Sequence, residues 1–322
     1  MNYRVLAGTG VQVSPICFGT MSFGGDADEE MSAAMFRQCR EAGINFFDCA
    51  NVYSNGMAEQ ILGKLSADCR DELVITSKVC MPMEEGPNTR GLSRRFILLN
   101  IEQSLKRLGT DRLDIYFVHH YDPLTPMDET LKVLDDLVRQ GKILYPAVSN
   151  WSAWQTAKAL GISDRNKLAR FVCLQPMYSL AKRQAEVELL PLAESEQLGV
   201  ISYSPLGGGL LTGKYTASSK PDSGRLLDNK MYTRRYAASI NYDVAEKFSA
   251  YAKEQGKHPA TLAVAWVKSH PAITAPIIGA RNLDQLGPSL AALEMDLTDG
   301  QREEITSLSM DPPPATDRAE ER

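Results

Sequence analysis

The sequence predicts a single (β/α)8 barrel, the TIM-barrel class of α/β fold, on three observations. Eight short apolar runs alternate with amphipathic helical patterns along the chain. Several of these runs are continuously apolar and rich in Val, Ile, Phe and Tyr, which is typical of strands that are buried on both faces. The length of 322 residues suits one large α/β barrel as well as it suits two average domains.

The predicted elements follow one another in the order that parallel strands joined by crossover helices require. An open, doubly wound sheet would alternate in the same way. However, no GxGxxG motif opens a helix after the first strand, and the count of eight favours a closed barrel. The strands are predicted at residues 16–21, 43–48, 72–78, 113–119, 143–149, 171–175, 199–204 and 275–280, and the clearest helices at 29–42, 92–108, 127–140, 184–198 and 259–269.

Capping signals mark several helix ends. One predicted helix ends at Gly109, a residue type that accepts the left-handed conformation found just beyond many helices. The next has Thr125 as a candidate N-cap and Pro126 at its first helical position. Near the carboxyl end, Thr298 and Gln301 have the spacing of a capping box.

Two segments lie outside the alternation. Residues 216–238 are polar without a sustained period, and a loop of that length inside a compact domain is usually functional. Residues 311–322 have the composition of a disordered, solvated tail. We therefore expect one barrel domain over residues 1–310.

Composition narrows the class of function. The net charge of −5 gives no electrostatic reason to expect a nucleic-acid partner. The chain shows no signal peptide and no apolar run near the ~20 residues of a membrane span, so we expect a cytoplasmic protein without a membrane partner. The six cysteines form no CxxC pair and fit free thiols, and the four histidines offer no zinc-site spacing, so no metal is expected.

A glycine-rich stretch at residues 202–215 contains most of a P-loop pattern. Four residues separate Gly208 from Gly213 and Lys214, but Tyr215 stands where a P-loop needs Ser or Thr to hold Mg²⁺. The preceding run reads as a buried strand. These residues alone leave two alternatives open, a loop that binds some other phosphate and a plain glycine-rich turn.

Four chemically compatible side chains fall at or just after successive strand ends, where α/β barrels carry their active sites. Asp48, Lys78 and His119 end the second, third and fourth predicted strands, and Tyr53 follows the second. Each residue alone is more often structural. Barrel closure would bring all four to one rim, and this coincidence favours a catalytic set.

The expected chemistry is acid–base catalysis by a tyrosine. The reference pKa of a phenol is ~10, and an ammonium such as that of Lys78 stabilises the phenolate. We expect this pair, with Asp48 compensating the buried Lys78, to lower the pKa of Tyr53 towards 7, a change of about 4 kcal/mol. His119 is expected to orient a substrate oxygen.

The same residues resemble the aldo-keto reductase family over almost the whole chain. The resemblance rests on the motifs VSPICFGTMSFGG, INFFDCANVYSNGMAEQILG, VITSKV, LDIYFVHH, VSNW, LQPMYSL, YSPLGGGLLTGKY and IIGARNLDQL, in that order. It places the family's catalytic tetrad on Asp48, Tyr53, Lys78 and His119. It also implies that residues 1–14 form a β-hairpin that closes the barrel floor. The branches that it resembles are bacterial and potassium-channel-beta-like.

The resemblance implies NADPH or NADP+ as cofactor, with NADH as an alternative. Ser149, Asn150 and Gln175 would contact the carboxamide, and Tyr203 would stack on the nicotinamide ring. The glycine-rich loop would hold the pyrophosphate, and two arginines the adenosine end. The expected cofactor contacts are Thr20, Met21, Asp48, Ser149, Asn150, Gln175, Tyr203, Ser204, Pro205, Leu206, Gly208, Lys214, Arg225, Gly279, Arg281 and Gln285.

The expected activity is reversible reduction of a small aldehyde or ketone, with Tyr53 as the general acid. A substrate pocket is expected from Phe23, Tyr53, His119, Tyr121 and Trp151. The alternative is a cofactor-sensing regulatory subunit, since potassium-channel beta subunits share this fold and tetrad. Neither the substrate nor the oligomeric state follows from the residues.

Overall fold

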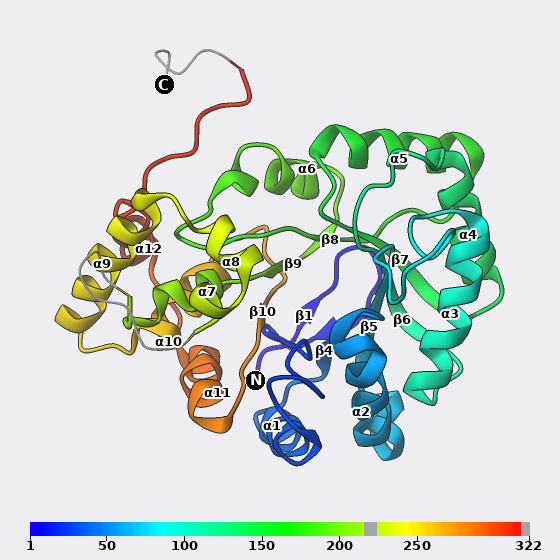
Figure 1. Ribbon diagram of the computed structural model, residues 1–322. Helices are drawn as coiled ribbons and strands as arrows, with labels where there is room; N and C mark the ends of the chain where they lie inside the picture. Colours follow the sequence, from blue (N-terminus) through cyan, green and yellow to red (C-terminus); the bar gives the residue numbers. More distant parts are fainter. Residues whose placement is uncertain (216–223, 317–322) are drawn as a thin grey trace.

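The computed structural model, which describes residues 1–215 and 224–316, confirms the predicted barrel. Parallel strands close in the order β10-β3-β4-β5-β6-β7-β8-β9, and the helices are arranged around them (Figure 1). Every predicted strand is present. The strands are β3 (Cys17–Gly19), β4 (Phe46–Asp48), β5 (Val74–Val79), β6 (Leu113–Val118), β7 (Ile143–Ser149), β8 (Cys173–Gln175), β9 (Gly199–Tyr203) and β10 (Ala275–Ile278).

The helices bury apolar stripes against the barrel. One example is α3, which buries Ile97, Ile101, Leu105 and Leu108 at helical spacing. In the part of the chain that is described, no helix combines the length and apolar composition that crossing a bilayer needs. The helices are α1 (Glu29–Glu41), α2 (Met57–Ser66), α3 (Arg94–Leu108), α4 (Met127–Arg139), α5 (Ala153–Asn166), α6 (Leu189–Ser195), α7 (Arg225–Asp228), α8 (Lys230–Arg235), α9 (Ser239–Glu254), α10 (Pro259–Lys268), α11 (Leu283–Leu290) and α12 (Asp299–Thr306).

Two of the three predicted helix ends are confirmed. Gly109 caps α3 with a φ of 62°, and the capping box is present at the start of α12. The prediction for α4 was wrong, because Pro126 is the N-cap and no side chain caps the helix. The hydroxyl of Thr125 instead donates to the carboxylate of Asp122 at 2.6 Å.

Two predicted segments also differ from the structure. The predicted helix 184–198 is a 3-10 turn at Gln184–Glu186 followed by the short α6. The polar segment 216–238 contains α7 and α8 rather than loop alone, while residues 216–223 lie outside the described part. Helices of four and six residues are too short to show a hydrophobic period.

An N-terminal hairpin closes one end of the barrel, as expected. Its strands β1 (Arg4–Val5) and β2 (Gln12–Val13) pair antiparallel. Leu6 and Val13 join the apolar cluster that fills the barrel interior. At the start of β9, a Cβ on Gly199 would lie only 2.5 Å from the Leu6 side chain, so the hairpin packs directly against the strand starts.

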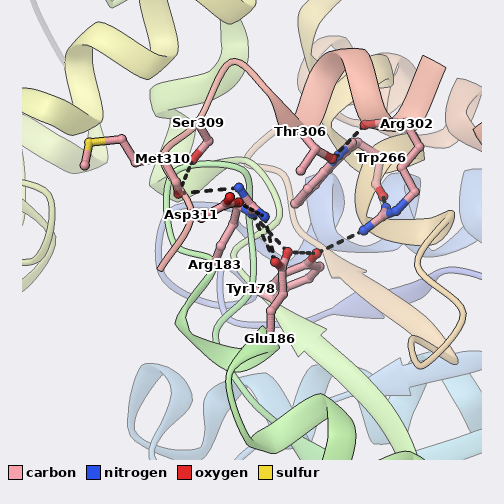
Figure 2. A network of polar contacts seen from close by, with 9 residues as sticks. All are labelled: Tyr178, Arg183, Glu186, Trp266, Arg302, Thr306, Ser309, Met310 and Asp311. Carbon is pink, nitrogen blue, oxygen red and sulfur yellow. Dashed lines mark hydrogen bonds and ion pairs between the residues drawn. The ribbon is translucent and has the colours of Figure 1, made fainter. Parts of the chain in front are cut away.

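A polar network ties the carboxyl-terminal segment to the body of the molecule (Figure 2). Arg183 donates to Glu186 at 2.8 Å and to Asp311 at 3.0 Å. Tyr178 donates its hydroxyl proton to Glu186 at 2.6 Å and accepts a bond from Arg302 of α12 at 3.2 Å. Asp311, the first residue of the predicted tail, is therefore held in place, and residues 317–322 lie outside the described part.

Candidate active site

The four side chains predicted to act together lie together at the carboxyl ends of the strands. The Nζ atom of Lys78 in β5 is 2.6 Å from an Asp48 oxygen at the end of β4 and 3.1 Å from the Tyr53 hydroxyl. The ring of His119, the residue after β6, lies edge-on to the Tyr53 ring with 6.3 Å between centroids. The barrel thus gathers a phenol, an ammonium, a carboxylate and an imidazole.

The alternation of side chains along each strand explains this convergence. Phe46 and Phe117 belong to the cluster that fills the barrel interior. Asp48 and His119 follow them by two residues, so their side chains point to the same side. Lys78 obeys the same alternation in β5. Polar groups therefore replace the apolar filling at one end of the barrel.

Lys78 uses all three of its N–H donors inside the site. It donates to Asp48 Oδ2 at 2.6 Å, to the Cys49 carbonyl at 2.7 Å and to the Tyr53 hydroxyl oxygen at 3.1 Å. The side chain is 0% exposed. Because the Tyr53 oxygen accepts from Lys78, its own proton is not used in that contact. Within residues 1–215 and 224–316, no group accepts that proton.

The carboxylate of Asp48 is held by a second set of donors. Its Oδ1 atom accepts from the Thr76 hydroxyl at 2.8 Å and from the Gln175 amide at 2.9 Å. Thr76 lies two residues before Lys78 on the same face of β5, a spacing that could have identified it from the sequence. The charge opposite Lys78 is therefore fixed in position.

The protonation states correct one expectation. Burial raises the pKa of Tyr53 to about 12, and the Lys78 ammonium opposes this only in part. The expected lowering of the Tyr53 pKa towards 7 was wrong. Lys78 also bonds to Asp48, and the negative charge of Asp48 raises the Tyr53 pKa. Burial opposes the charge of Lys78, but the Asp48 carboxylate and Tyr53 raise its pKa above the usual value. Burial and Lys78 hold the pKa of His119 well below its usual value.

The loops around the site contain residues with positive φ. Ser54 and Asn55 follow Tyr53 with φ of 47° and 53°, Asn150 follows β7 with 57°, and Ser204 follows β9 with 60°. Non-glycine residues rarely adopt this region, and strained residues gather at functional sites. The chain thus turns sharply after three of the elements that carry predicted site residues.

The residues expected near the carboxamide form a chain of hydrogen bonds beside His119. The Tyr203 hydroxyl donates to Asn150 Oδ1 at 2.7 Å. The Asn150 amide donates to the Ser149 hydroxyl oxygen and to the His119 carbonyl, both at 2.9 Å. The Ser149 hydroxyl donates to the Gln175 carbonyl at 2.9 Å. The structure brings these predicted residues together on one side of the site.

The glycine-rich loop after β9 is a compact turn, η4 (Gly207–Thr212). Its three glycines have φ of 60°, 68° and 100°, a conformation that favours glycine. A Cβ on Gly208 would lie 2.8 Å from the Tyr232 ring. Lys214 is exposed and reaches back to within 3.7 Å of a Cβ built on Gly209. The predicted contacts Ser204, Pro205 and Leu206 lead into this turn.

The two arginines expected at the adenosine end meet at a carboxylate that no sequence pattern indicated. Arg281 Nε is 3.0 Å from Asp26 Oδ2, and Arg225 Nη2 is 3.8 Å from the same oxygen. Gln285 accepts from the Arg281 backbone N–H at 3.2 Å. Burial and the nearby Arg281 lower the pKa of Lys214. Loops after β3, β9 and β10 thus meet at one charged cluster.

The remaining predicted cofactor contacts lie just after the paired strands β3 and β10. Thr20 is fully buried and donates its hydroxyl proton to the Asp48 carbonyl at 3.0 Å. Met21 keeps 38% of its surface exposed, and Gly279 is exposed just after β10. Of these three positions, Met21 and Gly279 are accessible, whereas Thr20 supports the backbone of Asp48.

The expected substrate pocket is only partly assembled. Tyr121 and Trp151 pack edge-on with 5.3 Å between centroids, and Trp154 joins Tyr121 at 6.5 Å. Phe23 is fully buried and packs against Phe18 at 5.7 Å. The prediction for Phe23 does not hold in this structure, because its ring fills the core beneath the site rather than lining an open surface.

A family model and several curated proteins match the chain over most of its length. Residues 15–310 match the family model described as Aldo/keto reductase family. The chain is 39% identical to "Uncharacterized oxidoreductase YrpG" of Bacillus subtilis, with 92% of each chain covered. It is 36% identical to a rice (Oryza sativa subsp. japonica) "Probable voltage-gated potassium channel subunit beta", again with 92% of each covered. It is 33% identical to "L-glyceraldehyde 3-phosphate reductase" of Escherichia coli, with 91% of this chain and 88% of that protein covered.

The family match and the fold agree with one another. The match begins just after the hairpin and extends through α12. The chain therefore belongs to the aldo/keto reductase family, a family of oxidoreductases that use nicotinamide cofactors.

Proposed function

We propose that this protein reversibly transfers a hydride between NADPH and a carbonyl or alcohol substrate. The observation that carries the proposal is the contact between Tyr53 and Lys78. The phenol accepts a hydrogen bond from the ammonium at 3.1 Å, and its own proton stays available for a substrate oxygen. A general acid needs this arrangement, since it must be protonated and must point at the reacting group.

The chain's own residues fit a dinucleotide phosphate. The glycine-rich turn η4 places Lys214 at its end, and an ammonium there suits a phosphate, whereas the N–H groups of Gly207 and Gly209 already bond to the Ser204 and Leu206 carbonyls at 2.9 and 3.0 Å. Arg225 and Arg281 together suit a 2′-phosphate, because a guanidinium binds phosphate through two donors. This chemistry favours NADPH over NADH. Bound NADPH supplies the hydride.

Each residue of the tetrad has a distinct part in proton transfer. Tyr53 donates its proton to the substrate oxygen as negative charge develops there. Lys78 stabilises the phenolate that results, and Asp48 keeps Lys78 charged and in place. His119, neutral because its pKa is lowered, can donate one N–H to the carbonyl oxygen and so fix its position.

The test is the Tyr53→Phe variant, with Tyr145→Phe as matched control. The Tyr145 hydroxyl bonds only weakly, at 3.4 Å, to the Thr9 carbonyl of the hairpin. We expect Tyr53→Phe to lower kcat by ~100-fold or more, with the Kd for NADPH unchanged, and Tyr145→Phe to keep wild-type turnover. Full activity in Tyr53→Phe would refute the assignment.

A second candidate function is a cofactor-sensing regulatory subunit. It is supported by the 36% identity to the protein named as a potassium channel subunit beta. This function requires NADPH binding and a stable complex with another protein. A screen over aldehydes, ketones and alcohols separates the two candidates, because turnover of any of them supports the enzyme. Binding of NADPH without turnover, together with a stable protein complex, would support the regulatory subunit.

A further inference from the structure

The segment 216–238 brings one more arginine to the site. Arg235, the last residue of α8, places its guanidinium carbon 5.9 Å from the centre of the Tyr203 ring and 5.0 Å from that of Tyr232. The side chain is half-buried. Figure 1 shows α8 beside β9, the strand that ends in Tyr203. Arg235 thus approaches the site from the loop after β9.

The charge of Arg235 has no carboxylate partner among residues 1–215 and 224–316. Its one hydrogen bond there is a long one, 3.7 Å to the sulfur of Met231. Several other shielded arginines of this chain have oxygen acceptors. Arg70 is paired with Asp114 and Arg183 with Glu186, both at 2.8 Å, and Arg302 donates to the Trp266 carbonyl at 2.7 Å. Because partial burial of an unpaired charge is unfavourable, the position of Arg235 calls for an anion.

This unpaired charge lies close to the predicted reaction centre. Tyr203 bonds to Asn150, which bonds to the His119 carbonyl, so two hydrogen-bonded residues connect the Arg235 contact to His119. His120 stacks its ring on His119 with 5.4 Å between centroids. Burial and the Arg235 charge both lower the pKa of His120, so His120 adds no second positive charge.

Aromatic side chains gather in the loops after the strands next to His119. Tyr121, Trp151 and Trp154 form an aromatic wall after β6 and β7, and Trp154 is 60% exposed. Arg235 offers a planar pair of donors that matches a planar carboxylate. One unit of positive charge is balanced by one carboxylate, whereas a phosphate monoester would carry up to two negative charges at neutral pH.

We propose that Arg235 is a specificity-determining residue that selects carbonyl substrates carrying a carboxylate group. The carbonyl would lie at Tyr53 and His119, with the carboxylate at the guanidinium of Arg235. This inference rests on the proposed function, because it names the substrate class of the same site. It assigns no part in hydride or proton transfer to Arg235.

The test compares two aldehydes that differ in one charge, 4-carboxybenzaldehyde and its neutral methyl ester, methyl 4-formylbenzoate. Binding to the full chain saturated with NADP+ is followed by tryptophan fluorescence, and turnover is followed with NADPH. The variants are Arg235→Gln and Arg235→Lys. Arg234→Gln is the matched control, since Arg234 is the exposed neighbour on the same helix.

We expect wild-type protein and Arg234→Gln to bind the acid about tenfold more tightly than the ester, and Arg235→Gln to lose that preference. Arg235→Lys should keep part of it, because the charge remains without the planar fork. Equal binding of acid and ester by wild-type protein, or equal losses in Arg234→Gln and Arg235→Gln, would overturn the inference. Binding decides this question by itself, whereas the proposed function is contradicted only if no compound in the wider screen of aldehydes, ketones and alcohols is turned over.

Discussion

Replacing Asp48 with Asn should lower the free energy of unfolding, because the buried Lys78 ammonium would lose its charged partner. Lys78 is 0% exposed and Asp48 3% exposed, with 2.6 Å between Nζ and Oδ2. Asp48 accepts three hydrogen bonds, from Lys78, Thr76 and Gln175. An asparagine offers one oxygen and one amide, so one of these donors must face an N–H group.

The expected loss of stability is about 3–5 kcal/mol near pH 7, the range for removing one partner of a buried ion pair. Its pH dependence has a definite sign. In wild-type protein the pKa of Lys78 is raised, so its favourable contribution is complete below the pKa of an unfolded lysine, ~10.4. In Asp48→Asn, burial alone would depress this pKa. The deficit should therefore shrink as pH rises from about 7 to about 9.5.

Urea unfolding followed by circular dichroism at both pH values measures this effect. Asp296→Asn is the control, because Lys268 is also buried, 4% exposed, but its partner Asp296 is 96% exposed at 3.0 Å. Solvent screens that pair, so a loss below about 1 kcal/mol is expected. Equal losses in the two variants, or a deficit in Asp48→Asn that is constant with pH, would refute the reasoning.

Three further predictions follow from the same structure. Asp26→Asn should tighten NADPH several-fold without affecting NADH, since Asp26 competes for the two arginines; equal tightening of both cofactors in fluorescence titrations contradicts this. The rate of carbonyl reduction should be independent of pH from about 6 to about 9, while the rate of alcohol oxidation should rise with pH. The reason is that the pKa of Tyr53 is raised to about 12 and that of His119 is lowered. An ionisation between about pH 6 and about pH 9 in the pH profile of reduction would contradict this prediction. Burial lowers the pKa of His270 to about 4, so its contribution to stability is present above about 6.5 and is lost as pH falls. Between about pH 7.5 and about pH 5, wild-type protein should therefore lose about 1 kcal/mol more than His270→Gln in urea unfolding.

The barrel and its tetrad could be predicted because both follow from short-range patterns. A buried strand shows as a continuous apolar run, and the first polar residue after it lies at the rim. Asp48, Lys78 and His119 could thus be placed without long-range information. The position of Tyr53 was harder to predict, since it depends on a left-handed turn at Ser54 and Asn55. This turn was not predicted from the sequence.

The charged cluster of Asp26, Arg225 and Arg281 could not be predicted in full. Its three members come from loops after different strands, where no period constrains the chain. Arg235 belongs to the same class. Phe23 was misplaced for a related reason, because an aromatic residue after a strand can turn either into the core or towards the mouth.

The direction in which the pKa of Tyr53 shifts could not be predicted from the sequence, for a different reason. The residue types predict an ammonium beside a phenol. The sign of the pKa shift depends on which acceptors the three N–H groups of Lys78 contact, and on how much water reaches the Tyr53 hydroxyl. In the folded chain Asp48 and the Cys49 carbonyl take two of these donors. Burial then outweighs the remaining contact, and the pKa rises.

A raised pKa is compatible with acid catalysis by Tyr53, because what matters is the difference between ground and transition states. In the proposed reaction the phenol would keep its proton until an alkoxide, a stronger base than the carbonyl, develops on the substrate and accepts it. Lys78 already touches the oxygen that becomes negative, so stabilising the phenolate requires no movement. In the proposed reaction the reverse step would begin from the phenolate, which is a minor species at pH 7 because burial raises the pKa of Tyr53. Alcohol oxidation is therefore the direction whose rate should increase as pH rises, while reduction starts from the protonated phenol that predominates at neutral pH.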